Sequence, residues 1–164
     1  MTNDQSSEQV RVFRDFFPLV LLHQLQEHIR GNSVRKETLD LRVEHLPRAI
    51  QAATVFASAR LHLPFNTCVA KWYRTTDPEP SGAYDWHVDP VELRYGPLVL
   101  ATAYGEALLE YRTHRSIHGI DCRTNTVVVI DSSLQHRVSP PRNSDGERLF
   151  LFLGWREPQD LTAP

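Results

Sequence analysis

The first third of the chain places its apolar residues at helical spacing in two stretches. The first stretch has four apolar residues on one face: Leu21, Leu22, Leu25 and Ile29. Asp15 is a residue type that caps helices, Pro18 suits a first helical turn, and Gly31 suits a helix end. This pattern predicts an amphipathic helix that begins at Asp15 and buries one side.

A second stretch has the same period and begins near Leu46 and Pro47. Its apolar positions are Leu46, Ile50, Ala53 and Phe56, and Pro64 sets its end. The sequence therefore predicts two helices between residues 15 and 62, which pack beside each other.

From Asn66 onward the pattern changes to short segments rich in β-branched and aromatic residues. These segments are NTCVAKWYRT, AYDWHVD, LVLATAY, ALLEYRT, TVVVID, QHRVS and RLFLFLGW. Clusters such as DPEPSG and PPRNSDGE separate them and are typical of turns. Helices followed by many short strands predict an α+β domain, with an antiparallel sandwich or barrel over residues 66–156.

Length and composition favour one domain. The chain has 164 residues, of which 41% are hydrophobic, and this is enough for a single core. Residues 1–9 are polar and have no periodicity, so we expect a disordered tail there and a single domain over 10–164.

Charge and cysteine content exclude several function classes. Eighteen Lys and Arg oppose twenty Asp and Glu, which leaves a formal net charge of −2. The chain therefore has no overall positive charge that would attract nucleic acid or an anionic membrane. Cys68 and Cys122 lack the spacing of a zinc site or a disulfide framework, and no apolar run is long enough to cross a bilayer. We expect a cytoplasmic protein.

One short segment carries two metal-ligating residue types. His87 and Asp89 are separated by one residue, so in a strand both side chains point to the same face. His136 follows the apolar segment 126–130 and can supply a third ligand from elsewhere in the chain. Two imidazoles and a carboxylate on one side of an ion leave positions open for a co-substrate and oxygen, which suits iron(II).

An arginine at the head of the last strand adds a second kind of chemistry. If Arg148 points inward from its apolar strand, it needs an anionic partner, and a dicarboxylate is a good bidentate one. Two alternatives are a surface position for Arg148 and a role for Arg142 in the preceding turn.

Two further features of the sequence have ordinary structural explanations. Alternation turns Trp86 away from His87, toward core packing. The basic run over residues 112–118 is either a solvated strand and loop or a contact for an anionic substrate.

These motifs follow one another in a recognisable order: His87-x-Asp89, His136-x-Val138-x-Pro140, and Gly146-x-Arg148 ahead of an apolar strand and Trp155. The order resembles the iron(II) and 2-oxoglutarate dependent dioxygenase superfamily, especially its prolyl-hydroxylase-like branch, from about Val12 to Trp155. The resemblance implies a double-stranded β-helix, or jelly-roll, core with N-terminal helices packed against it. It also implies iron(II) on His87, Asp89 and His136, with the distal carboxylate of 2-oxoglutarate on Arg148.

The resemblance extends to further candidates for the co-substrate pocket. An upstream tyrosine is common in the branch, so Tyr73 is a candidate for a hydroxyl contact, with an ordinary packing role as the alternative. Thr102 or Tyr104, on the strand after HxD, could supply another contact. The chain departs from many relatives at Phe150, where a Ser or Thr stands in them, so the pocket must be completed differently.

The function implied by this resemblance is oxidation of an unactivated C–H bond with oxygen and 2-oxoglutarate, releasing succinate and CO2. Halogen-transferring relatives have Gly or Ala in place of the carboxylate, so Asp89 favours a hydroxylase. The expected substrate is a small molecule, an amino acid or a peptide. The alternatives are a cupin-like metal enzyme that does not use 2-oxoglutarate, which usually has HxH, and a non-catalytic binding module on the same fold.

Overall fold

A computed structural model describes residues 9–31, 41–42, 47–65, 67–75, 84–89 and 96–155. Within these ranges the elements are β1 (Val10–Phe13), α1 (Leu19–Gly31), β2 (Leu41–Arg42), α2 (Arg48–Leu61), β3 (Thr67–Arg74), β4 (Leu98–Tyr104), β5 (Ala107–Arg112), β6 (Ile117–Cys122), β7 (Thr126–Ile130), β8 (His136–Val138) and β9 (Glu147–Gly154). Residues 1–8 of the expected tail lie outside the described ranges.

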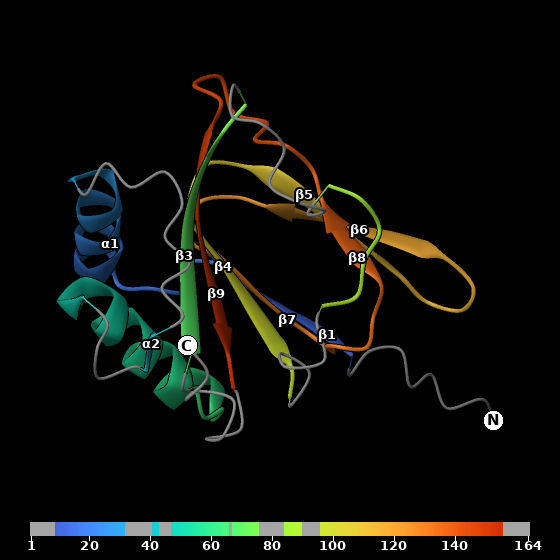
Figure 1. Cartoon of the computed structure of the whole chain (residues 1–164), viewed down its shortest axis with the longest axis horizontal. Helices are drawn as coiled ribbons and strands as arrows, with labels where there is room; N and C mark the ends of the chain where they lie inside the picture. Colours follow the sequence, from blue (N-terminus) through green and yellow to red (C-terminus); the bar gives the residue numbers. More distant parts are fainter. Residues whose placement is uncertain are drawn as a thin grey trace.

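Two antiparallel sheets form the body of the molecule. The large sheet has the strand order β1-β7-β4-β9-β3-β2, and the small sheet has the order β6-β5-β8. Helices α1 and α2 lie side by side against one face of the large sheet, and the small sheet lies on its other side (Figure 1). The expected α+β architecture, with N-terminal helices on a jelly-roll core, is confirmed.

The central strands of the large sheet are buried on both faces, and their side chains alternate between two cores. On β9, Leu149, Leu151 and Leu153 pack toward the helices, whereas Phe150 and Phe152 pack toward the small sheet. Strands β4 and β7 divide their residues in the same way. The period of two along a strand therefore builds a helix-side core and an inner core from one set of strands.

The start of the chain differs from the sequence-based expectation. Asp15 does not cap a helix, because α1 begins four residues later at Leu19. Asp15 instead adopts a positive φ of 48° in the connection that follows β1, a strand paired with β7 at the edge of the large sheet. Helix α1 begins at Leu19, and the amide of Leu22 donates to the carbonyl of Pro18. Helix α2 agrees with its prediction, with Pro47 at its N-cap. The side chain of Ile29 lies outside the described part.

A buried asparagine fastens the helical layer to the large sheet. Asn125, in the turn between β6 and β7, accepts a hydrogen bond from the Phe17 amide at 2.8 Å and donates one to the Phe17 carbonyl at 3.0 Å. Its own carbonyl accepts from the Phe16 amide. Asn125 has a φ of 64°, a left-handed conformation that Asn adopts more readily than most residues.

We expect Asn125→Ala to lower the free energy of unfolding by about 2–3 kcal/mol, because it leaves two buried backbone groups of Phe17 unsatisfied. Urea unfolding followed by circular dichroism measures the loss. Asn125→Gly is the matched control, since glycine keeps the left-handed backbone and removes only the side-chain bonds. A loss below 0.5 kcal/mol in both variants, roughly the size of a neutral surface change, would contradict this role.

Both cysteines are free and buried. Burial raises the pKa of the Cys68 thiol from 9.0 to about 12 and also raises the pKa of Cys122, although the positive charge of Arg148 opposes the second rise. None of the helices in the described ranges has the length and apolarity needed to cross a membrane.

The raised pKa of Cys68 predicts a pH-dependent stability. Between pH 9 and about 12 the unfolded thiol loses its proton while the folded thiol keeps it, so the free energy of unfolding falls as pH rises. Denaturant titrations over this range should show a steeper fall for the natural protein than for Cys68→Ala. Parallel curves for the two proteins would refute the assignment.

Candidate metal centre

A single backbone pair brings His87 and His136 together. The amide of His87 donates to the His136 carbonyl at 3.0 Å, and the amide of His136 donates to the His87 carbonyl at 2.9 Å. Directly paired residues of antiparallel strands point to the same side, and the two ring centroids lie 4.5 Å apart. The segment 84–89, where the sequence predicted a strand, forms no strand and pairs with β8 through His87 alone. This pair places His87 at the edge of the small sheet beside β8.

Asp89 completes a compact group. One ligand atom from each of His87, Asp89 and His136 lies within 4.8 Å of the other two. The His136 Nε2 and Asp89 Oδ2 atoms are 3.4 Å apart, which is close to the separation of two ligands that share one ion at bond lengths of about 2.1 Å.

Hydrogen bonds on the far side of each ring orient the two imidazoles. The Nδ1 of His87 lies 2.8 Å from the Asp85 carbonyl, and the Nδ1 of His136 lies 3.0 Å from the Leu134 carbonyl. A carbonyl only accepts, so Nδ1 carries the hydrogen and Nε2 keeps its lone pair for a metal. Metal-binding histidines commonly have such a partner, and the donor set of two imidazoles and one carboxylate fits iron(II).

The group opens into a cavity of about 150 Å³ between the two sheets. The cavity is lined by Val69, Lys71, Tyr84, His87, Asp89, Leu100, His136, Val138, Ser139, Pro141, Arg148, Phe150 and Phe152. Arg148 is only 3% exposed and donates to the Thr102 hydroxyl at 3.1 Å. A buried guanidinium therefore lines the same cavity as the three ligating residue types, and Thr102 helps to hold it.

The structure gives different information on Tyr73 and Tyr104, the two tyrosines considered for the co-substrate pocket. The backbone of Tyr73 pairs with Arg148 in the β3–β9 register, while its side chain lies outside the described part, so its role stays a prediction. Tyr104 is not brought to the cavity, because an irregularity in the β4–β9 pairing between Thr102 and Tyr104 changes the direction of its side chain. Its hydroxyl donates to Asp145, and its ring packs with the helix-side core.

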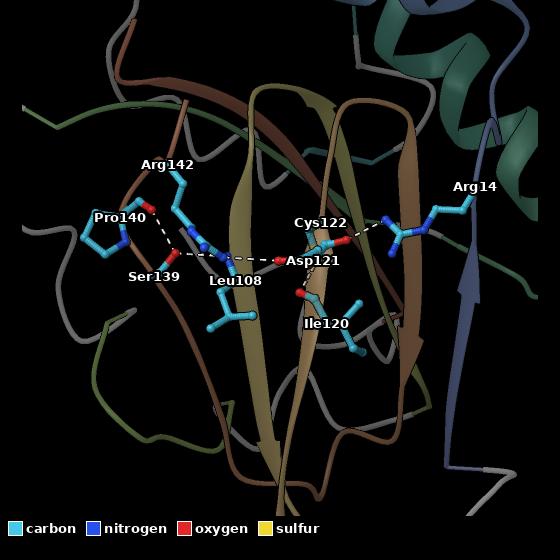
Figure 2. A network of polar contacts seen from close by, with 8 residues as sticks. All are labelled: Arg14, Leu108, Ile120, Asp121, Cys122, Ser139, Pro140 and Arg142. Atoms are coloured by element: carbon cyan, nitrogen blue, oxygen red, sulfur yellow. Dashed lines mark hydrogen bonds and ion pairs between the residues drawn. The ribbon is translucent and has the colours of Figure 1, made fainter. Parts of the chain in front are cut away.

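The other arginine considered for the co-substrate has a different partner. Arg142 forms an ion pair with the Asp121 carboxylate at 3.1 Å, and both side chains are more than half exposed. Figure 2 shows Arg142 and Arg14 reaching Asp121 from opposite sides, Arg14 through the backbone carbonyl of Asp121. Arg142 therefore ties the connection before β9 to β6, while Arg148 is the arginine that lines the cavity.

Among the cavity residues that sequence reasoning did not single out are Lys71 and Tyr84. Lys71 has the same parity as Val69 on β3, so alternation could have placed it on the inner face. Tyr84 stands three residues before His87 in a segment with no clear period, and no signal in the sequence pointed to it. Trp86 faces away from His87 as expected, but it stacks on arginine side chains and not in the core.

Comparison with solved structures places this fold beside known oxygenases. A prolyl-4-hydroxylase from Pseudomonas putida is 17% identical, with 94% of this chain and 96% of that chain covered at a TM-score of 0.61. A Trichoplax adhaerens prolyl hydroxylase, solved with a hypoxia inducible factor peptide fragment, is 14% identical. The match covers 99% of this chain and 90% of that chain, with a TM-score of 0.65.

Acireductone dioxygenase from Bacillus anthracis, with a cadmium ion in its active centre, is 11% identical. The match covers 91% of this chain and 79% of that chain, with a TM-score of 0.56. No protein-family model matches the chain, and a search of curated proteins gave no match. At these identities the likeness shows the fold alone. The chain has a prolyl-hydroxylase-like jelly-roll fold.

We expect the protein to bind one divalent cation at His87, Asp89 and His136. Titration with cobalt(II), followed by its visible absorption, should show saturation at one ion per chain, and His136→Ala should weaken binding by at least about 100-fold. His118→Ala is the matched control, because His118 is an exposed histidine on β6 of the same small sheet. Equal loss in the two variants would rule out this ligand assignment.

Proposed function

We propose that this protein is an iron(II) and 2-oxoglutarate dependent oxygenase, of the hydroxylase type, acting on an unactivated C–H bond and releasing succinate and CO2. One observation carries the proposal. The three ligating side chains and a buried arginine line a single cavity between the two sheets. A metal that activates oxygen and a cation that binds a dicarboxylate are the two groups this chemistry requires.

Two groups of cavity residues have separate roles in this proposal. His87, Asp89 and His136 would hold iron(II), which supplies oxygen activation when bound. Arg148, supported by the Thr102 hydroxyl, would take the distal carboxylate of 2-oxoglutarate as a bidentate partner. Lys71 lines the same cavity and adds a second positive charge that favours a dianion over a neutral ligand.

Apolar side chains form one wall of the proposed pocket. Phe150 occupies the position where many relatives have a hydroxyl residue, and the Arg148 guanidinium lies 5.1 Å from its ring centroid. Leu100 and Phe152 complete this wall. An apolar wall keeps water from the buried charges and strengthens their attraction for the co-substrate.

The proposed substrate class is a small molecule, an amino acid or a peptide. The Trichoplax neighbour was solved with a peptide, which supports the peptide option within that class. A cupin-like metal enzyme without 2-oxoglutarate is the alternative for the same fold, and it assigns no co-substrate to Arg148. A non-catalytic binding module is the second alternative, and it predicts no turnover at all.

Succinate release tests the proposal. Protein loaded with iron(II) in the absence of oxygen is supplied with 2-oxoglutarate, and oxygen is then admitted. We expect succinate from the natural protein, none from His136→Ala or Asp89→Ala, and a large rise in the KM for 2-oxoglutarate in Arg148→Ala. Because Arg148 is buried, Arg148→Lys is added as a variant that keeps the charge but loses the bidentate geometry.

Arg142→Ala is the matched control, since this arginine is exposed and ion-paired with Asp121. Its KM for 2-oxoglutarate should stay unchanged. Binding of iron(II) and of 2-oxoglutarate is also measured directly by titration, because some oxygenases start only with their substrate present. Failure of both ligands to bind would overturn the proposed function, and iron-dependent turnover independent of 2-oxoglutarate would favour the cupin-like alternative.

A further inference from the structure

Trp86 occupies an unusual position on the outer face of the segment that carries two of the proposed ligands. Its ring contacts two guanidinium groups, with the Arg112 Cζ 3.9 Å and the Arg137 Cζ 4.7 Å from the ring centroid. Trp86 precedes His87, and side chains alternate along an extended segment. The imidazole thus points into the cavity while the indole packs on the opposite side.

Both arginines are themselves held in place. The Nε of Arg137 donates to Glu110 Oε2 at 2.6 Å, and the Nη1 of Arg112 donates to Gln135 Oε1 at 3.0 Å. A guanidinium fixed by a hydrogen bond presents its flat face in a defined orientation and loses little further freedom on stacking. The indole therefore lies against a preorganised surface of β5 and β8.

These contacts link the chain neighbours of the two histidines. Arg137 follows His136 directly, and Gln135, which holds Arg112, precedes it. On the inner face, the same two segments are joined through the backbone pair of His87 and His136. The backbone pair fixes the spacing of the two segments at one point, and the stack on the outer face holds them at a further point and so limits their relative rotation.

We propose that Trp86 is a positioning residue for the metal centre, which it orients through the Arg112 and Arg137 stack. This inference rests on the proposed metal site of the oxygenase. By fixing the rotation of the segment 84–89 against β8, the stack sets the distance of His87 and Asp89 from His136. Groups that orient ligands without touching the ion commonly change metal affinity by about 10- to 100-fold when they are removed.

Cobalt(II) titration of Trp86→Leu and Trp86→Phe tests the inference. We expect the Kd for cobalt(II) to rise by about 10- to 100-fold in Trp86→Leu, with an altered ligand-field absorption, and to recover most of its natural value in Trp86→Phe, because a phenyl ring keeps a π face for the guanidinium groups. If Trp86→Leu does not fold, Arg112→Gln replaces it in the test, because it removes the nearer guanidinium without leaving a large cavity. We expect Arg112→Gln also to raise the Kd for cobalt(II).

Trp72→Leu is the matched control. The Arg74 Cζ lies 4.6 Å from the Trp72 ring centroid, so the same kind of stack is removed. Trp72 stands on β3, however, which is paired with β9 along its whole length. We expect Trp72→Leu to lower the melting temperature and leave the Kd for cobalt(II) unchanged.

The outcomes separate this inference from the proposed function. If the natural protein binds cobalt(II) and Trp86→Leu loses no more affinity than Trp72→Leu, the positioning role is refuted while the metal centre stands. If the natural protein fails to bind cobalt(II), the metal centre itself is refuted. Loss of affinity in Trp86→Leu with a melting temperature equal to that of Trp72→Leu supports the positioning role.

Discussion

The two-sided burial of β9 is the constraint on which the rest of the molecule depends. Its leucines fill the core beneath the helices, and its alternate residues, including Arg148, face the cavity. A shift of one residue in the pairing with β3 or β4 would send the leucines to the cavity and the guanidinium into the helix-side core. Burial of the apolar residues thus fixes the register, and the register fixes where the positive charge lies.

The main elements of the fold could be predicted because their local patterns are clear. Strands β4, β7 and β9 are short apolar runs rich in residues that favour strands, and α2 has the helical period and a proline at its start. Strand β1 was missed because Asp15 suggested a helix cap, and β6 was missed because its residues are mostly exposed. Their strand conformation comes from pairing with β7 and β5, which no local pattern reveals.

The candidate site could be predicted where alternation and residue chemistry agree. His87, Asp89 and His136 share a face and come together, and Arg148 and Thr102 meet on the large sheet. Tyr104 could not be placed correctly, since parity along β4 fails at an irregularity that the sequence does not mark. The surroundings of Trp86 were equally hidden, because its stacking partners come from β5 and from β8.

The candidate site draws its two halves from different sheets. His136 belongs to the small sheet and His87 is paired with it, whereas Arg148 and Thr102 belong to the large sheet. The arrangement of the three ligating side chains is thus determined at the edge of one sheet, while their distance from the Arg148 guanidinium depends on how the two sheets pack. In the proposed oxygenase, the inner core between the sheets would therefore set the length of the anion that fits, and the backbone pair with its outer stack would set the metal geometry.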